Sequence, residues 1–212
     1  TIDSTIQSYA EQVVREGIEQ YDVQNGGICI VMNPKTGAIY AMVSIPDYDL
    51  NDPSAIYDGS LKAGLEKMKG DSTTTDEAYQ DAVTAARAAQ WRSKALNDAY
   101  EPGSTFKSVV LSAALEEGVV SESDTFYCPG YAIVNGQRIN CSKHAGHGTQ
   151  TLAQAVANSC NPAFITIGQR LGAEKFYQYF TDFGMKNYTG IDLQGEALGT
   201  VWDEDYFTSA EG

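Results

Sequence analysis

The N-terminal part of the sequence limits the fold most, because it predicts an amphipathic helix followed directly by a β-hairpin. Apolar side chains recur at helical spacing between residues 4 and 21, at Ile6, Tyr9, Ala10, Val13, Val14 and Ile18. Two short β-type segments follow at 26–32 and 38–43, and Pro34 and Gly37 between them are typical of a hairpin turn. The helix and the hairpin each have an apolar face to bury. We therefore expect the helix to pack across an antiparallel sheet in an α+β fold.

Length and charge narrow the class of protein further. A chain of 212 residues predicts one domain, at most with an appendage, and 42% hydrophobic residues are enough for a packed core. Asp and Glu number 28 against 14 Lys and Arg, a net charge of −14 that would repel nucleic acid. No apolar run approaches the ~20 residues of a bilayer-spanning helix. The chain opens with Thr-Ile-Asp and not with a signal peptide, so we expect a piece of a longer protein.

Further along, helical and irregular segments alternate. Helical composition recurs at 62–69, 76–95, 105–117, 151–171 and 175–183. The segment 105–117 is apolar on nearly all sides, which predicts a buried helix. Asn161-Pro162 divides 151–171 into two helices that meet at a bend, and Asn135-Gly136 predicts the turn of a second hairpin within 127–140.

Two stretches predict exposed structure. Residues 70–75, Gly-Asp-Ser-Thr-Thr-Thr, are typical of a linker, and we expect them to be exposed and mobile. The tail after residue 190 is expected to be mostly loop. Its last part, residues 196–212, contains five carboxylates and no basic residue, which predicts a solvated surface.

The segment 102–107, Pro-Gly-Ser-Thr-Phe-Lys, is the first candidate for chemistry. If a helix starts at Ser104, then Lys107 lies one turn later on the same face, within reach of the serine hydroxyl. A serine nucleophile needs a neighbouring base, and apolar surroundings can lower the pKa of a lysine enough for its amine to serve. Free N–H groups at the helix N-terminus could stabilise an oxyanion. The alternative is a capping serine beside a solvated lysine, since composition alone gives about one Ser-x-x-Lys in such a chain.

Ser159-Cys160-Asn161, at the predicted bend between two apolar helices, is the second candidate. A hydroxyl and a carboxamide two residues apart could both face one cleft, where they could relay a proton and hold an amide carbonyl. Standing alone, the segment is better explained as a capping pair before Pro162.

Taken in order, these motifs resemble the transpeptidase domain of class B penicillin-binding proteins. Glu-Pro-Gly precedes Ser-Thr-Phe-Lys, and Asn-Ser-Cys-Asn-Pro-Ala-Phe follows about fifty residues later. Residues 33–42, 146–149 and 189–193 also resemble segments of this family, so the resemblance covers nearly the whole chain. It is closer to the division and sporulation members than to the elongation members.

The resemblance implies a fold, an activity and roles for four residues. The fold would be that of penicillin-binding transpeptidases and serine β-lactamases: an antiparallel sheet flanked by helices plus an all-α subdomain, over residues 1–212 with a polar insert at about 51–95. The activity would be peptidoglycan D,D-transpeptidation through an acyl-serine intermediate. Ser104 would be the acylated nucleophile and Lys107 its general base. Ser159 would pass a proton to the departing D-Ala, and Asn161 would bind the substrate backbone.

The same resemblance implies partners and a location. The partners would be peptidoglycan stem peptides, β-lactam antibiotics and, through the parent protein, other cell-wall synthesis proteins. The location would be the extracytoplasmic face of the bacterial membrane, with the anchor outside this chain. One alternative is a class D β-lactamase or β-lactam sensor, which shares Ser-Thr-Phe-Lys but has Ser-x-Val where this chain has Ser-Cys-Asn. A second alternative is a non-catalytic scaffold, against which the four intact site residues argue.

The chain departs from the family pattern at the third motif. A Lys-Thr/Ser-Gly strand would be expected beyond the 189–193 loop, but none follows there. Lys35-Thr36-Gly37 has the same letters but precedes Ser104 and falls in the predicted hairpin turn. We therefore expect a fold truncated at the C-terminus, with two of the family's five sheet strands and an exposed sheet edge. We also expect little or no acylation by penicillin for these residues alone.

Four residues near the second hairpin are compatible with two kinds of site. Cys128 and Cys141 flank the predicted turn, so they would lie almost opposite each other as a disulfide or as adjacent thiols. His144 and His147 follow at Cys-x-x-His-x-x-His spacing, which is also compatible with a Cys2His2 zinc site.

The sequence favours the disulfide or the adjacent thiols, because it contains no Cys-x-x-Cys pair and the family resemblance already accounts for the segment around His147. We therefore expect no metal and no cofactor. Cys29 and Cys160 are expected to pack as small apolar residues. Assigning Cys160 as the nucleophile would leave the pair of Ser104 and Lys107 unexplained.

Overall fold

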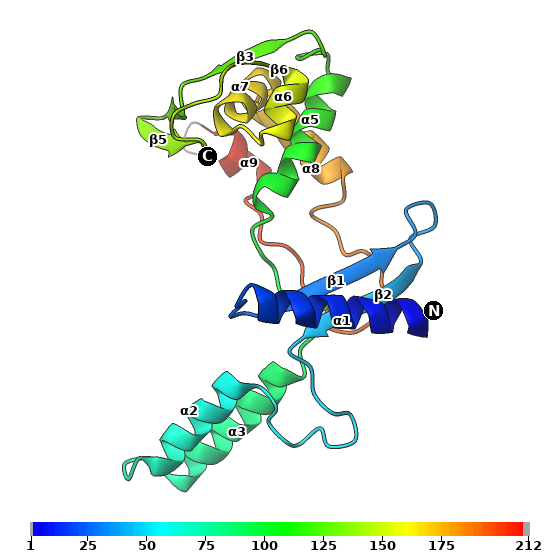
Figure 1. The fold of residues 1–212 in the computed structure, drawn as a ribbon, viewed down its shortest axis with the longest axis vertical. Coiled ribbons are helices and arrows are strands. Elements are labelled where there is room, and N and C mark those ends of the chain that lie inside the picture. The colour runs from blue at the N-terminus through cyan, green and yellow to red at the C-terminus, as the bar shows by residue number, and fades with distance from the viewer. Residues whose placement is uncertain (1, 210–212) are drawn as a thin grey trace. The chain divides into compact units, whose positions relative to one another are not determined.

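The computed structural model describes residues 2–209, which divide into two compact units (Figure 1). The first contains the chain up to Asp98 together with Leu193–Ala197, and the second contains Ala99–Asp192 and the residues from Leu198 onward. Each unit combines helices with antiparallel strands, which confirms the α+β class. No helix among residues 2–209 has the length and apolar content needed to cross a membrane.

The predicted helix and hairpin form the centre of the first unit. Helix α1 spans Ser4–Gln20, and strands β1 (Gly27–Met32) and β2 (Ile39–Ile45) pair antiparallel. Helix α1 packs on both strands (Figure 1). The Gln7 amide fixes this packing, because it accepts from the Met42 N–H at 2.8 Å and donates to the Met42 carbonyl at 3.1 Å.

The buried face of α1 is narrower than the sequence predicts. Tyr9 and Val13 are 67% and 64% exposed, although their spacing placed them on the apolar face. The side chains that turn towards the sheet are the i, i+4 series Ile6, Ala10, Val14 and Ile18, which are half-buried. A two-stranded sheet covers only this single row of side chains.

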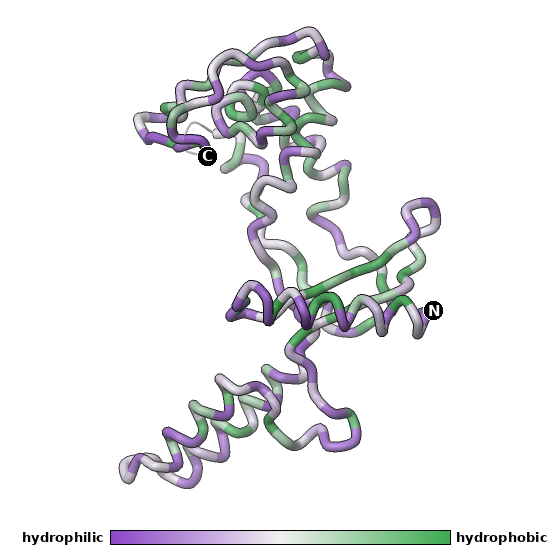
Figure 2. Tube along the Cα trace, in the orientation of Figure 1, coloured by the Kyte–Doolittle hydropathy of each residue, from purple (hydrophilic) through white to green (hydrophobic). Residues whose placement is uncertain are grey.

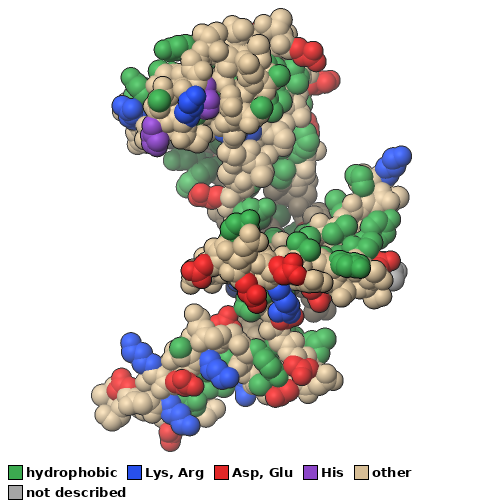
Figure 3. Space-filling view, viewed as in Figure 1, with side chains coloured by type: hydrophobic (Ala, Val, Ile, Leu, Met, Phe, Trp, Pro, Cys, Tyr) green, Lys and Arg blue, Asp and Glu red, His purple; other side chains and the backbone are tan. Residues whose placement is uncertain are grey.

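Strand β1 carries the most continuous apolar stretch of the first unit (Figure 2). Its side chains alternate between half-buried and exposed, and Ile28, Ile30 and Met32 are the exposed ones. Hydrophobic side chains accordingly gather on the surface over this hairpin (Figure 3). Lys35-Thr36-Gly37 lies in the turn between the two strands, as predicted.

The polar segment at about 51–95 contains a pair of helices, α2 (Gly59–Gly70) and α3 (Asp76–Gln90), followed by the short α4 (Lys94–Asn97). The connection between α2 and α3 is mostly exposed, as predicted for 70–75. Gln90 is buried at the end of α3, where its amide donates to the Ala55 carbonyl and accepts from the Tyr57 N–H. This amide attaches the irregular segment before α2 to α3.

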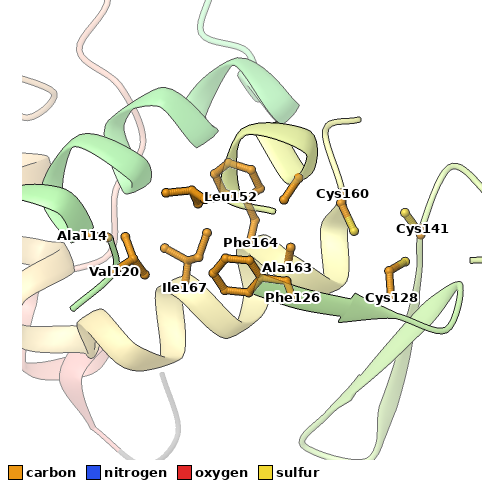
Figure 4. Close-up of a cluster of buried hydrophobic side chains, with 11 residues drawn as sticks. Ala114, Val120, Phe126, Cys128, Cys141, Leu152, Cys160, Ala163, Phe164 and Ile167 are labelled. Carbon is orange, nitrogen blue, oxygen red and sulfur yellow. The ribbon is translucent and has the colours of Figure 1, made fainter. Parts of the chain in front are cut away.

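The second unit begins with a 3-10 turn and contains most of the shorter elements. In chain order these are η1 (Gly103–Phe106), α5 (Lys107–Glu116), β3 (Thr125–Cys128), β4 (Tyr131–Val134), β5 (Gln137–Asn140), β6 (Gly148–Thr151), α6 (Leu152–Ala157), α7 (Asn161–Leu171), α8 (Ala173–Asp182) and α9 (Glu204–Thr208). Helix α7 packs against α5, α8 and strand β3. The core lies between them (Figure 4) and includes Ala114, Val120, Phe126, Leu152, Phe164 and Ile167.

The strands of this unit pair differently from the prediction. Asn135-Gly136 does turn a hairpin, but that hairpin joins β4 and β5 only. Cys128, which the prediction placed in the same hairpin, ends β3, and β3 pairs with β6. The chain leaves β3 at Gly130, whose φ is +96° and whose missing Cβ would lie 2.1 Å from the His144 carbonyl oxygen. This close backbone approach separates the β3–β6 pair from the β4–β5 hairpin.

The tail also has more structure than predicted. Helix α9 forms within the segment expected to be solvated loop, and the Asp203 carboxylate caps it by accepting from the Tyr206 N–H. The Phe207 ring stacks on Phe176 of α8 with the ring centroids 5.4 Å apart. Because one aromatic side chain can bury itself against α8, the acidic residues around it remain in water while the backbone folds.

The core contacts predict a clear difference between two isoleucines of the second unit. Ile167→Ala removes a side chain with 0% exposure and should lower the free energy of unfolding by about 2–5 kcal/mol. Ile133→Ala is the matched control, because Ile133 is 57% exposed in β4, and it should cost no more than about 1 kcal/mol. Urea unfolding followed by circular dichroism would measure both values. Equal losses would contradict the placement of the core.

Candidate active site

Ser104 lies in the short turn that leads into α5. Gly103 enters this turn with φ +57°, a left-handed conformation that glycine adopts without strain, and Pro102 precedes it. The prediction of a helix from Ser104 is therefore refined, since a 3-10 turn covers 103–106 and the α-helix begins at Lys107. Thr105 stabilises the turn by donating its hydroxyl to the Pro102 carbonyl. Ser104 remains exposed just before the N-terminal end of α5.

The Lys107 amine makes three hydrogen bonds to the segment between α6 and α7. It donates to the Ser159 carbonyl oxygen at 2.7 Å, to Ser159 Oγ at 3.0 Å and to Asn161 Oδ1 at 2.7 Å. An ammonium group has three donors, and these acceptors use all of them. The two motifs, more than fifty residues apart in sequence, therefore meet at one nitrogen atom.

Ser159 adopts a backbone conformation that normally belongs to glycine. Its φ is +47°, at the position where α6 ends in a Schellman motif. The Cys160 N–H donates to the Ala155 carbonyl, and the Ser159 N–H donates to the Val156 carbonyl. A non-glycine residue here costs about 1–2 kcal/mol. The two hydrogen bonds that Lys107 donates to Ser159 offset this cost and hold the Ser159 hydroxyl beside the amine.

Asn161 begins α7 and is oriented from both ends of its amide. Its oxygen accepts from Lys107, and its nitrogen donates to the Asn140 carbonyl at the end of β5 at 2.8 Å. Pro162 occupies the first turn of α7, where its missing N–H leaves no bond unmade. The predicted bend at Asn161-Pro162 is thus a helix start, and the break lies at Asn158–Cys160.

A pocket of about 290 Å³ opens beside these residues. It is lined by Ser104, Thr105, Lys107, Ser108, Leu111, Val156, Ser159 and Phe164. Ser104 and Lys107 thus line the same cavity. Both are described residues, and no hydrogen bond joins them. The Phe164 ring centroid lies 5.3 Å from the Lys107 nitrogen and forms an apolar wall. Polar groups for acyl transfer are therefore gathered at one apolar-walled opening.

Burial sets the proton affinity of the lysine. Removal of water lowers the pKa of Lys107 from its ordinary 10.5, while the nearby thiols of Cys141 and Cys160 act in the opposite direction. The neutral amine has two donors and one lone pair, so one of its three hydrogen bonds must be given up on deprotonation. The Ser159 hydroxyl can reverse its bond by donating to the lone pair. The site can thus move a proton between Lys107 and Ser159 without moving a heavy atom.

Cys128 and Cys141 lie close together as free thiols, which is one of the two arrangements that the sequence analysis expected. The structure adds Cys160 and His147 to them, and the three cysteines are buried together. Cys160 thus belongs to this cluster as well as to the core, whereas His144 is exposed and lies outside it. The sequence pattern did not reveal this, because Cys160 comes from the start of α7 and not from the hairpin.

The strain at Ser159 predicts a stability difference between two variants that both lack the hydroxyl. The free energy of unfolding should be about 1 kcal/mol larger for Ser159→Gly than for Ser159→Ala, because only glycine adopts φ +47° without strain. Thermal unfolding of the two proteins measures this difference. A Ser159→Ala protein as stable as Ser159→Gly would mean that the left-handed conformation is absent in solution.

Comparison with known proteins identifies the family of this chain. The family model described as penicillin binding protein transpeptidase domain matches residues 27–211. Stage V sporulation protein D of Bacillus subtilis is 38% identical over 203 residues, which cover 95% of this chain and 27% of that protein. Peptidoglycan D,D-transpeptidase MrdA of Haemophilus influenzae is 28% identical over the same share of this chain.

A solved structure shows the same fold. The D,D-transpeptidase domain of a peptidoglycan glycosyltransferase from Eggerthella lenta superposes with a TM-score of 0.65 at 30% identity, covering 89% of this chain and 38% of that one. The chain spans about a quarter of the length of the curated relatives named above. The family match, the ordered motifs and the shared fold lead to one conclusion: the chain belongs to the penicillin-binding protein transpeptidase family.

Proposed function

We propose that the whole protein containing this chain is a peptidoglycan D,D-transpeptidase that cross-links stem peptides through an acyl-serine intermediate. The observation that carries the proposal is the Lys107 amine, bonded to Ser159 and Asn161 inside a pocket that Ser104 also lines. The Haemophilus and Eggerthella relatives are named as D,D-transpeptidases, which supports the same reaction.

Acylation begins at the Ser104 hydroxyl. Neutral Lys107 takes its proton as the oxygen attacks the carbonyl carbon between the two terminal D-Ala residues of a stem peptide. The proton then passes through the Ser159 hydroxyl to the nitrogen of the departing D-Ala. The C–N bond breaks and Ser104 carries the acyl group. An amine of a second stem peptide then attacks the ester, which forms the cross-link and returns the proton to the site.

Asn161 has a different role in this proposal, because its amide acts as neither an acid nor a base near neutral pH. Its oxygen holds Lys107, and its nitrogen is held by the Asn140 carbonyl. A substrate backbone bound at Asn161 would replace part of this network. Asn161 therefore positions both the base and the peptide.

The ligands and the location follow from the same reaction. A β-lactam resembles the D-Ala–D-Ala dipeptide and would acylate Ser104 to give a slowly hydrolysed ester. Stem peptides lie outside the cytoplasmic membrane, so the site works on that face, together with other cell-wall synthesis proteins. Catalysis would also need the Lys-Thr/Ser-Gly strand of the family, which residues 162–212 do not contain.

Labelling with a fluorescent penicillin tests the proposal in the whole protein. The wild type should form a covalent adduct that peptide mass analysis assigns to Ser104, and Ser104→Ala should form none. Ser112→Ala is the matched control, because Ser112 is an exposed serine two turns along the same chain segment and should leave labelling unchanged. An adduct on another residue would refute the assignment. Sustained nitrocefin hydrolysis would indicate a β-lactamase, and an unlabelled wild type would indicate a scaffold.

The lowered pKa of Lys107 predicts the pH dependence of acylation. The base must be neutral, and desolvation makes the amine lose its proton at a lower pH than an exposed lysine. The rate of penicillin acylation should therefore rise with pH and level off below pH 10.5. Lys107→Arg should acylate at least about 100-fold more slowly with no plateau, because a guanidinium keeps its proton. Stopped-flow acylation rates across pH would show a flat wild-type profile if Lys107 is not the base.

A further inference from the structure

The hairpin of β4 and β5 adjoins the candidate site and carries an arginine that makes no ion pair within residues 2–209. Asn161 donates to the Asn140 carbonyl at the end of this hairpin. Arg138 lies two residues earlier in β5 and is exposed. We propose that the exposed face of this hairpin binds a free carboxylate of the peptide substrate, on the N-terminal side of the bond that Ser104 attacks. The proposal rests on the proposed function for the identity of the peptide.

The chain around this hairpin lacks the acidic residues that are abundant elsewhere. Residues 125–173 contain no Asp or Glu, although the whole chain has 28 of them. The Lys and Arg residues of this segment are Arg138, Lys143 and Arg170. Arg170 is paired with Asp124, so Arg138 and Lys143 are the two that no carboxylate neutralises in the described part of the chain. Figure 3 shows basic side chains and no acidic ones over β5. This surface therefore attracts an anion that the rest of the protein repels.

Four side chains share one face of the hairpin. Antiparallel pairing sets Tyr131 opposite Asn140 and Ile133 opposite Arg138. Opposed residues, and residues two apart along a strand, project from the same face of a sheet. Ile133 is 57% exposed on this face, and Arg138 and Asn140 are exposed as well. An aliphatic side chain, a guanidinium and an amide thus lie together, and they can contact both the apolar and the charged parts of a peptide.

Arg138 is held in one orientation before any ligand binds. Its Cζ lies 3.8 Å from the Tyr131 ring centroid, and its Nε donates to Asn140 Oδ1 at 3.0 Å. A guanidinium has five N–H donors, so four remain on the two terminal nitrogens, and these have no hydrogen-bond partner within residues 2–209. Two parallel N–H groups match the two oxygens of a carboxylate. A side chain that is already oriented loses little conformational entropy when it binds one.

A short series of contacts connects this guanidinium to the base. Arg138 bonds the side chain of Asn140, whose carbonyl accepts from Asn161. Asn161 in turn accepts from Lys107. These contacts extend at most about 15 Å from the Lys107 nitrogen, a span that four or five residues of an extended peptide cover. A stem peptide whose backbone lies at Asn161 can therefore place one of its upstream carboxylates at Arg138.

An anionic membrane surface is the other class of ligand that a guanidinium attracts. Binding to such a surface takes clusters of about four to eight basic residues. The hairpin and the loop after it contribute two, Arg138 and Lys143. A single oriented guanidinium beside an exposed Ile133 is better matched to one carboxylate of a bound peptide than to a charged surface.

Equilibrium binding of two peptides tests the proposal in the whole protein carrying Ser104→Ala, which cannot form an acyl-enzyme. Both probes are fluorescein-labelled pentapeptides that end in D-Ala–D-Ala. The second residue carries a free carboxylate in one probe and the corresponding primary amide in the other. Fluorescence anisotropy should show about fivefold tighter binding of the carboxylate peptide at low salt. Added salt should reduce this ratio, because it screens an exposed charge pair.

Variants of the hairpin locate the carboxylate. Arg138→Gln should bring the affinity ratio of the two peptides close to one, because it removes the charge from an exposed position. Tyr131→Ala should lower the ratio as well, since the guanidinium loses the ring that orients it. Arg170→Gln is the matched control: its Cζ also lies over a ring, 5.3 Å from the Phe126 centroid, but Asp124 already neutralises it. This control should keep the fivefold ratio.

Several outcomes would overturn the proposal. They are equal affinity for the two peptides, binding of neither peptide, a ratio that persists in Arg138→Gln, and an equal loss of the ratio in Arg170→Gln. Binding to vesicles of anionic phospholipid that depends on Arg138, without a preference for the carboxylate peptide, would assign the face to a membrane instead. None of these measurements requires acylation. Failure of the carboxylate site is therefore distinguishable from failure of the proposed function, which penicillin labelling of Ser104 reports.

Discussion

The candidate site depends on one nitrogen atom that joins two helices. The Lys107 amine at the start of α5 binds Ser159 and Asn161 at the junction of α6 and α7, and these contacts hold the junction in a strained conformation. An amine with three acceptors around it is held in one place, and partial burial lowers its pKa. The contacts therefore account for the position of the base and for the left-handed serine beside it, whereas the lowered pKa comes from burial.

The packing of α5 against α7 makes this contact possible. The core between the two helices and β3 is built from small and branched side chains, among them Ala114, Ala163 and Ile167. Small residues let the helices approach closely enough for a lysine to reach across. Cys160, between Ser159 and Asn161, is fully buried in this core. Its burial anchors the segment that carries the two residues bound to Lys107.

Tertiary structure overrode local pattern at several points. Tyr9 and Val13 have the spacing of a buried face, yet they are exposed because the hairpin covers one row of α1 only. The segment around Cys128 was placed in the wrong hairpin, because strand pairing depends on partners that a local pattern does not contain. Helix α9 was missed since its single anchor, Phe207, packs on a helix about thirty residues earlier.

The sequence by itself determined the helix and hairpin of the first unit, the division of residues 151–171 into two helices, and the motifs that identify the family. Helical and strand periodicity and turn residues are local, so one chain carries them without a structure. Only the tertiary structure decided that all three N–H groups of Lys107 are bonded to Ser159 and Asn161 and that the backbone of Ser159 is left-handed. It alone placed Cys160 and His147 with Cys128 and Cys141. These facts depend on how segments far apart in sequence pack, and side-chain contacts of that kind leave no periodic signal in the chain.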